Sequence, residues 1–447
     1  MGTISSAGLY TAPAAVPSPA MVTVTAVSQA DASKSSSTSV TVTSGPSVTI
    51  TPASITLGLG ANTQFSAAVT GSTNTAVIWQ VNGVAGGNVT VGTIDSTGLY
   101  IGPGALPTPV AVNVTAVAQV DSTTTSTPSP VTLSATDPLG SVTTHATLTC
   151  PGGGVSGATC YTLNVSCPGV ADLTTYLKVN TPIGTPTGTV LFGIGTGGSG
   201  LYDSEFKSGK TAVENVLAGG YTTVQVTFGS PFTTAVPSGW LTGPGGVRHL
   251  ACRYATTAQW IYANIHNSNA GAPMCGTGNS GGSAAISYAL ARFGLDSIFS
   301  MVEPTSGPPM ARIDFGCICN QPDANTSCGQ GNLSLCYQGS SSILDDAYNS
   351  TICTDAVKSR STANQPLFLS DSILAPGAKL SYPKTDVHFL FGGLDNTSAV
   401  PLGLLYFNSI TSTTSQACVA DAPHPLPDVL DGATTVASDI IARCHLQ

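Results

Sequence analysis

The chain has 447 residues, of which only 8% are charged and 41% are hydrophobic, and its formal net charge is −9. A chain of this length can hold two or three domains and bury a large core. The negative charge and the lack of any Lys/Arg cluster argue against a nucleic-acid partner, because nothing would contact the phosphates. No apolar run reaches the length of a transmembrane helix, so we expect no membrane partner.

The first part of the chain contains an internal repeat. Residues 2–13 (GTISSAGLYTAP) recur as residues 92–103 (GTIDSTGLYIGP), ninety positions later. Alternating Val and Thr residues between Gly/Pro turns predict antiparallel strands, and the stretches resemble bacterial Ig-like repeats of extracellular proteins. We expect a partial repeat over residues 1–45 and an Ig-like domain over 46–137, acting as a spacer or surface contact. Because the first copy holds only the back half of a repeat, we expect the chain to be part of a longer secreted protein.

The twelve cysteines all lie between residues 150 and 444. An even number confined to one part of the chain predicts a disulfide set in one domain and a secreted or cell-surface location, where the surroundings are oxidising. Four cysteines between residues 317 and 336 come nearest to a metal signature. They lack C-x-x-C pairs and a nearby histidine, so we expect no metal there.

From about residue 145 the pattern changes to strands that alternate with helices, which predicts a mostly parallel sheet. Strands are expected at 161–166, 174–180, 188–193, 221–228, 270–275, 297–302 and 387–391, and helices at 211–217, 255–266, 283–294 and 429–443. This order resembles the α/β-hydrolase fold. The predicted fold class is therefore a multidomain chain, with an all-β Ig-like part followed by an α/β-hydrolase domain over 138–447. Residues 315–375, with five cysteines and weak periodicity, are expected to form a disulfide-rich insertion over the site.

The segment Gly278–Gly282 (GNSGG) has the G-x-S-x-G pattern. Chance alone would give on the order of one such match in a chain this rich in glycine. The pattern gains weight from its position between the predicted strand 270–275 and the predicted helix 283–294. A tight turn between strand and helix would push the Ser280 side chain out at the edge of the sheet, with only glycine fitting beside it. We therefore predict that Ser280 is a nucleophile; the alternative is a flexible glycine loop.

The resemblance also implies a place for the oxyanion hole. Residues 193–200 (GIGTGGSG) follow the strand 188–193, where α/β-hydrolases carry their oxyanion loop, although the histidine of the HGGG version is missing. The implied donors are the N–H of Thr196 or Gly197 and the N–H of Gly281. A dinucleotide-binding interpretation fails because no acidic residue ends the next strand, so no cofactor is expected.

Ser280 needs a base, and six histidines compete for that role. The chain order implied by the resemblance, serine then acid then histidine, favours His424, in a proline-bounded loop before the last helix. His388 lies inside an apolar strand and is expected to be core. Asp395 directly follows the strand 387–391 and is the predicted acid. Its rivals are Glu303, after an earlier strand, and the interpretation of Asp395 as a turn residue that bonds its own backbone.

These residues predict a secreted serine carboxylic-ester hydrolase that works through an acyl-enzyme, with Ser280, His424 and Asp395 as the triad. By resemblance, the leading substrates are feruloyl or acetyl esters on polysaccharides, and polyesters. A serine peptidase on the same fold and a catalytically dead adhesive or carbohydrate-binding surface protein are the alternatives. We expect a monomer, and a Cys418–Cys444 bridge that ties the His424 loop to the last helix.

Overall fold

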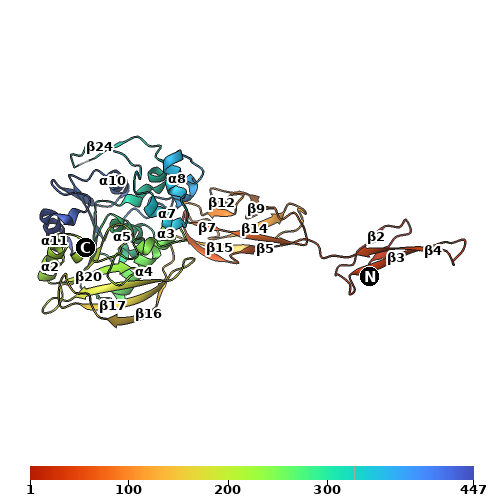
Figure 1. The fold of residues 1–447 in the computed structure, drawn as a ribbon, viewed down its shortest axis with the longest axis horizontal. Coiled ribbons are helices and arrows are strands. Elements are labelled where there is room, and N and C mark those ends of the chain that lie inside the picture. The colour runs from red at the N-terminus through yellow and green to blue at the C-terminus, as the bar shows by residue number, and fades with distance from the viewer. Residues whose placement is uncertain (327, 447) are drawn as a thin grey trace. The chain divides into compact units, whose positions relative to one another are not determined.

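The computed structural model describes residues 1–326 and 328–446 (Figure 1). The chain consists of two compact units. The first unit comprises Met1–Ile55, Thr63–Tyr100 and Ala111–Thr132. The second comprises Thr56–Asn62, Ile101–Val110 and the chain from Leu133 onward. Two short segments that precede the α/β part in sequence therefore belong to the same unit as it does. Among the described residues, no helix is both long enough and apolar enough to cross a bilayer.

The strands before residue 135 are short, and the pairs given below are antiparallel. They are β1 (Thr3–Ile4), β2 (Tyr10–Thr11), β3 (Met21–Val27), β4 (Ser35–Thr41), β5 (Ser47–Thr51), β6 (Ile55–Gly58), β7 (Asn62–Gln64), β8 (Ser66–Thr70), β9 (Val77–Val81), β10 (Val84–Ala85), β11 (Gly87–Asn88), β12 (Gly92–Ile94), β13 (Leu99–Ile101), β14 (Ala111–Ala118) and β15 (Ser129–Ser134). β3 pairs with β4, β5 with β8, and β14 with both β9 and β15. Trp79 and Val81 of β9 are buried, whereas Ile78, just before Trp79, is half exposed and Gln80, between them, is partly exposed, the alternation expected of a strand with one face in a core. The Ig-like topology of this region stays a prediction.

A nine-stranded sheet forms the centre of the second unit. Its strands are β16 (Ser141–Leu148), β17 (Thr159–Ser166), β18 (Leu173–Asn180), β19 (Gly188–Gly193), β20 (Tyr221–Phe228), β21 (Met274–Asn279), β22 (Met301–Thr305), β25 (Asp386–Gly392) and β26 (Thr414–Val419). Their order across the sheet is β16-β17-β18-β20-β19-β21-β22-β25-β26. The pairs from β16 to β20 are antiparallel, and every pair from β20 to β26 is parallel. This mostly parallel sheet agrees with the predicted α/β-hydrolase fold.

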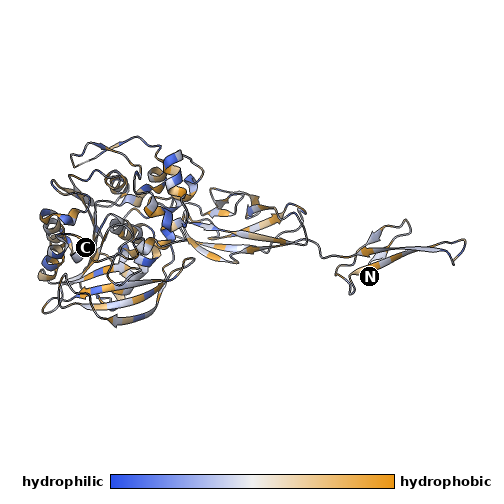
Figure 2. Cartoon of the chain, viewed as in Figure 1, coloured by the Kyte–Doolittle hydropathy of each residue, from blue (hydrophilic) through white to orange (hydrophobic). Residues whose placement is uncertain are grey.

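Helices cover both faces of this sheet (Figure 1). The longer ones are α2 (Gly209–Ala218), α4 (Cys252–Asn264), α5 (Gly281–Ala291), α10 (Ala399–Ser409) and α11 (Leu430–Arg443). Alternation along β19 separates two cores: Leu191 is buried with α4 and α5, whereas Val190 and Phe192 are buried with α2 and α11. Helix α11 buries one face, including Val436, Ala437 and Ile440, and Figure 2 shows both hydrophilic and hydrophobic residues along it.

The insertion and the loops contribute shorter elements. These are α1 (Tyr202–Glu205), α3 (Val247–Leu250), α6 (Ile313–Ile318), α7 (Ser342–Tyr348), α8 (Ile352–Ser359), α9 (Gln365–Asp371), β23 (Ala324–Asn325), β24 (Asn332–Leu333), and four 3-10 turns at Gly239–Leu241, Leu295–Ser297, Pro309–Arg312 and Leu426–Asp428. Strand β26 and helix α10 were not predicted, since neither segment showed a clear period in the sequence.

Two strands lie a few residues later than predicted. Strand β21 runs over Met274–Asn279 rather than 270–275, and β22 over Met301–Thr305 rather than 297–302. Glycine is uncommon in strands, so the glycines at 276 and 278 made the end of β21 difficult to predict from the sequence. The glycines are explained by packing: a Cβ on Gly276 would lie 2.6 Å from Ile286 Cδ1, and one on Gly278 would lie 2.5 Å from the Gly282 backbone. Helix α5 can therefore pack directly on the strand that leads into it.

The twelve cysteines form six disulfides and none is free. The pairs are Cys150–Cys160, Cys167–Cys252, Cys275–Cys444, Cys317–Cys353, Cys319–Cys336 and Cys328–Cys418. The expected Cys418–Cys444 bridge is wrong. Cys444, at the end of α11, lies against the start of β21, where its Cα is 5.9 Å from that of Cys275, within bonding range. Cys418, in β26, instead bonds Cys328 and so fastens the insertion to the sheet.

Two buried arginines fix the segment Thr56–Asn62 within the second unit. Arg248 makes paired bonds of 2.7 and 2.8 Å with the Asp137 carboxylate and donates to the Leu59 carbonyl at 2.8 Å. Arg292 also donates to the Leu59 carbonyl, at 3.3 Å. Burial and the neighbouring Arg248 lower the pKa of Arg292 to about 9. A chain with so few charges thus uses several of them in its interior, where they are paired.

Replacing Cys275 and Cys444 together by serine should lower the free energy of unfolding by about 5 kcal/mol, because that bridge spans 169 residues of chain and restricts the unfolded state strongly. The matched control is the double serine variant of Cys150 and Cys160, which are 10 residues apart and should cost only about 3 kcal/mol. Denaturant titration of both variants measures the difference, and equal losses would contradict it.

Candidate active site

Ser280 joins strand β21 directly to helix α5 in an unusual backbone conformation. Its φ of 53° and ψ of −112° are outside the regions that non-glycine residues normally occupy, so the turn is strained. The conformation is held from both sides: the Ser280 N–H donates to the Thr305 carbonyl at 2.9 Å, and its carbonyl accepts the Ala284 N–H at 3.0 Å. Such a turn points the side chain away from both elements, as the G-x-S-x-G pattern predicts.

The residues after Ser280 must be glycine because another loop lies against them. A Cβ on Gly281 would overlap the carbonyl oxygen of Thr196, and one on Gly282 would lie 2.6 Å from the Ile194 carbonyl oxygen. Thr196 itself has a positive φ of 52°. The loop after β19 therefore reaches the start of α5 only because the sequence has no side chains there.

His424 and Asp395 form a hydrogen-bonded chain with Ser280. His424 Nε2 lies 2.9 Å from Ser280 Oγ, and His424 Nδ1 lies 2.8 Å from Asp395 Oδ2. Asp395 is fully buried, while the His424 side chain is 27% exposed. The other carboxylate oxygen, Oδ1, accepts from the N–H and hydroxyl of Thr397 at 3.0 and 2.8 Å. Asp395 thus both caps its own turn and meets the imidazole, so the two interpretations of this residue are compatible.

Glycines also bring the Asp395 turn beside the His424 loop. A Cβ on Gly392 would overlap the Ala422 carbonyl oxygen, and one on Gly393 would overlap that of Ala420. The loops that follow β25 and β26 can consequently run side by side. Since these neighbouring parallel strands end at the same edge of the sheet, residues 29 positions apart come within hydrogen-bonding distance.

Asn279 is a residue of the site that the sequence did not single out. Its Oδ1 accepts the Leu426 N–H at 3.3 Å and the Thr305 hydroxyl at 3.1 Å. It therefore links the Ser280 turn to the chain just after His424. Its position inside the pattern G-x-S-x-G, where x is unspecified, gave no signal in the sequence.

Ser280 lies between two cavities that share Thr196, Ser280 and His424 among their lining residues. The larger, of about 540 Å³, extends over Gly281 and Met310 to insertion residues including Tyr337 and Leu344. The smaller, of about 330 Å³, is lined by the loop after β19, by Glu205 and Phe206, and by residues of the loop before the first 3-10 turn. Residues of the segment 315–375 thus line the larger cavity, and its formation of a separate insertion stays a prediction.

Two backbone N–H groups at the larger cavity are available to an anion. Within the described chain, neither Thr196 nor Gly281 donates its N–H to another residue. Gly197 has a different environment: its carbonyl accepts the Trp240 N–H at 2.7 Å, and a Cβ on it would overlap the Ser238 carbonyl oxygen. It lines neither of the two cavities. Of the two alternatives in the loop, Thr196 is the one that lines the cavities beside Ser280.

Glu303, the rival acid, lies elsewhere. It is fully buried in β22, where the Thr277 hydroxyl approaches its Oε1 at 3.4 Å, and it faces His388 and Asp439. Burial, helped by the Asp439 charge, raises its pKa well above the usual value. His388 is 3% exposed, as expected of a core position. In the described residues, these three side chains are the one group of His, Cys, Asp and Glu residues close enough together to hold a metal ion. Neither His424 nor Asp395 belongs to this group.

No family model matches the chain, and no curated protein matches it in sequence. Similar solved structures include Est1E from Butyrivibrio proteoclasticus (11% identity, covering 63% of this chain and 98% of that one, TM-score 0.38). Another is acetyl xylan esterase 1 from Thermoanaerobacterium, with 16% identity, covering 66% of this chain and 86% of that one, at a TM-score of 0.41. A dienelactone hydrolase from Anabaena variabilis has 15% identity, covering 65% of this chain and 99% of that one, at a TM-score of 0.37.

Replacing Gly281 by alanine should lower the free energy of unfolding by at least about 1–3 kcal/mol, because the new methyl group overlaps the Thr196 carbonyl and the loop must move. Gly152→Ala is the control, since nothing lies within 4 Å of its Cβ position and its backbone suits any residue. Chemical denaturation of the two variants tests this, and equal stability would show that the loop is not packed as described.

Proposed function

We propose that the second unit is a serine carboxylic-ester hydrolase that works through an acyl-enzyme. The observation that carries the proposal is the chain Ser280 Oγ, His424 and Asp395, with contacts of 2.9 and 2.8 Å, beside two free backbone N–H groups. A hydroxyl, a base, an orienting carboxylate and an anion site are the parts that acyl transfer needs.

The geometry supports a direct sequence of proton movements. Ser280 Oγ attacks the ester carbonyl carbon while its proton passes to His424 Nε2. Asp395 Oδ2 accepts a hydrogen bond from His424 Nδ1–H. This bond fixes the tautomer in which Nε2 is the base, and it stabilises the imidazolium that forms when Nε2 takes the proton. The negatively charged oxygen of the tetrahedral intermediate accepts hydrogen bonds from the backbone N–H groups of Thr196 and Gly281. His424 then gives its proton to the leaving alcohol, and a water molecule repeats these steps to release the acid.

The two cavities on either side of Ser280 support a substrate with a group on each side of the scissile bond. The larger cavity combines apolar surface from Met310, Ile343 and Leu344 with the hydroxyl-bearing residues Ser334 and Ser340, which suits a group that is neither purely aliphatic nor charged. Of the similar structures, one is Est1E with ferulic acid bound and another is an acetyl xylan esterase. We therefore propose esters on polysaccharides, or polyesters, as the substrate class.

The remaining expectations are part of the same proposal. Six disulfides suit a secreted or cell-surface protein, and the N-terminal β-strands would act as an Ig-like spacer on a monomeric enzyme. A serine peptidase is the second candidate, since the same groups can cleave amides. Comparing aryl esters, a feruloylated sugar, a polyester film and peptide anilides in one panel separates the two, and cleavage of the anilides alone would favour the peptidase.

Ser280→Ala should reduce ester hydrolysis by about a thousandfold or more, because the acyl-enzyme can no longer form. The measurement is release of p-nitrophenol from p-nitrophenyl acetate, with the burst of the first turnover recorded in the parent enzyme. Ser287→Ala, seven residues further along, is the matched serine change: Ser287 is buried in α5, and its hydroxyl has no hydrogen-bond partner in the described residues. Residual activity above about one percent in Ser280→Ala would point to another nucleophile.

Asp395→Asn should lower turnover by about four orders of magnitude, because an amide at this position favours the wrong tautomer of His424. Asp421→Asn is the matched control, since this exposed aspartate lies three residues before His424. Steady-state kinetics on a soluble ester gives both values. If Asp395→Asn keeps most of its activity and Glu303→Gln loses it, the acid has been assigned to the wrong residue.

A further inference from the structure

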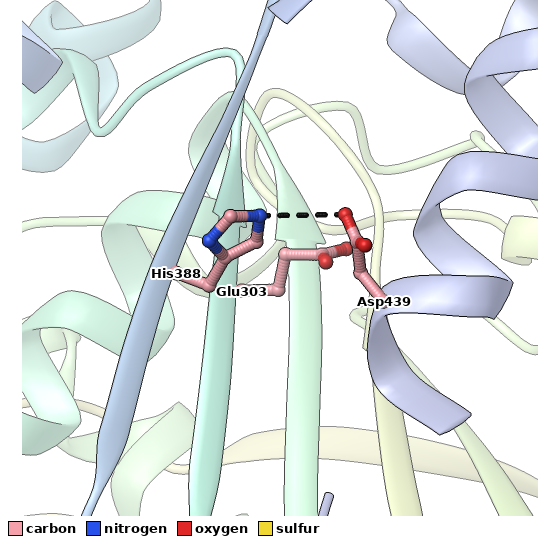
Figure 3. Close-up of side chains that lie close together, drawn as sticks. All are labelled: Glu303, His388 and Asp439. Atoms are coloured by element: carbon pink, nitrogen blue, oxygen red, sulfur yellow. Dashed lines mark ion pairs between the residues drawn. The ribbon is translucent and has the colours of Figure 1, made fainter. Parts of the chain in front are cut away.

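A second group of ionisable side chains lies on the face of the sheet that α11 covers. Glu303 comes from β22, His388 from the adjacent β25, and Asp439 from α11 (Figure 3). One ligand atom from each residue lies within 4.8 Å of the other two, and His388 Nε2 is 3.3 Å from Asp439 Oδ2. The catalytic proposal uses none of these groups.

Glu303 lacks the partners that a buried carboxylate needs. It is fully buried, its Oε1 has one long contact of 3.4 Å with the Thr277 hydroxyl, and its Oε2 has no hydrogen-bond partner in the described residues. Arg443, the positive group that acts on it, is bonded to Asp386 at 3.0 Å. Burying a carboxylate without compensation costs several kcal/mol, so a proton or a cation has to offset this charge.

His388, next to Glu303, also has a polar atom without a hydrogen-bond partner in the described residues. Its Nδ1 is 2.7 Å from the Ser415 hydroxyl, while its Nε2 has no hydrogen-bond partner in the described residues. If Nδ1–H donates to Ser415, the lone pair of Nε2 faces the Asp439 carboxylate. Two acceptors then face one another across 3.3 Å, which is unfavourable without a positive group between them. An outer hydrogen bond of this kind is also what orients metal-binding histidines.

We propose that Glu303, His388 and Asp439 bind a divalent metal ion, Zn²⁺, that joins helix α11 to the sheet. Two carboxylates and one imidazole nitrogen balance its charge and are ligands that zinc accepts. Zinc bonds of about 2.0–2.2 Å place neighbouring ligand atoms roughly 3.3 Å apart. The His388–Asp439 pair already has this separation, and the partly exposed Asp439 offers an entry path. Calcium fits poorly, because it takes six to eight oxygen ligands.

Such a site would act on the catalytic site through the backbone rather than through substrate. Strand β22 ends at Thr305, whose carbonyl accepts the Ser280 N–H, and β25 leads into the turn that carries Asp395. Tying α11 to both strands would stabilise this arrangement without adding a group to the chemistry. We expect a structural metal site.

The test uses the full chain, stripped with EDTA and then given ZnCl₂. Bound zinc is measured by elemental analysis after gel filtration, affinity by calorimetry, and stability by thermal unfolding. We expect one tightly bound zinc per chain and a raised Tm. Asp439→Asn should weaken this binding by at least about 100-fold, since even changes outside the ligand shell cost about 10–100-fold. Asp431→Asn, an exposed aspartate of the same helix, should bind zinc like the parent.

Glu303→Gln gives a second readout. In EDTA, Glu303→Gln should have a Tm at or above that of the parent, because the neutral amide replaces a buried carboxylate whose Oε2 has no hydrogen-bond partner in the described residues. Zinc should restore the Tm of the parent and leave that of the variant unchanged.

Equal zinc binding by the parent and Asp439→Asn would overturn the proposal, since the metal would then be held elsewhere, for example by His424. So would the absence of tight zinc binding, or a rise in Tm with CaCl₂ and not with ZnCl₂. If zinc does not bind tightly, a proton alone compensates the buried charge of Glu303.

Discussion

The structure of the second unit depends on the strained turn at Ser280, where a parallel strand passes into a helix without an intervening loop. That turn requires α5 to pack directly on β21, which in turn requires glycine at 276 and 278. It also requires the loop after β19 to lie against the helix start, which only glycine at 281 and 282 allows. The cost of a positive φ at a serine is offset by bonds to the neighbouring strand and helix. Removing any of these close contacts would move the hydroxyl and the nearby N–H groups together.

The rest of the site follows from the ends of parallel strands meeting at one edge of the sheet. The loops after β19, β25 and β26 deliver the free N–H of Thr196, the carboxylate and the imidazole, and the turn between β21 and α5 delivers the hydroxyl. The loops are held by different means. Glycines let the Asp395 and His424 loops run side by side, Asn279 bonds the chain after His424, and the Cys328–Cys418 bridge fastens the insertion that lines the larger cavity.

Charge is scarce in this chain, and several of its charges are buried. Arg248 with Asp137 and Lys178 with Asp203 are paired at 2.7 and 2.6 Å, and Asp395 is satisfied by Thr397 and His424. Glu303 is the exception among these, which is why it carries a proposal of its own. The face that holds it is also where the Cys275–Cys444 bridge fixes the end of α11, so both features concern how the last helix is attached to the sheet.

The sequence by itself predicted the mostly parallel sheet of the second unit, and it singled out Ser280, Asp395 and His424, which the structure brings into contact. A strand, the pattern GNSGG and a helix in that order indicate the turn at Ser280, because the pattern is local and glycine has a local reason to be there. The resemblance to α/β-hydrolases supplied the order that pointed to Asp395 and His424, which the tertiary structure brings into contact although they are far from Ser280 in sequence. The disulfide partners, the hydrogen bonds of Asn279 and the position of Thr196 rather than Gly197 beside the cavities are visible only in the tertiary structure. Each depends on which distant backbone lies within a few ångströms, and neither composition nor periodicity carries that information.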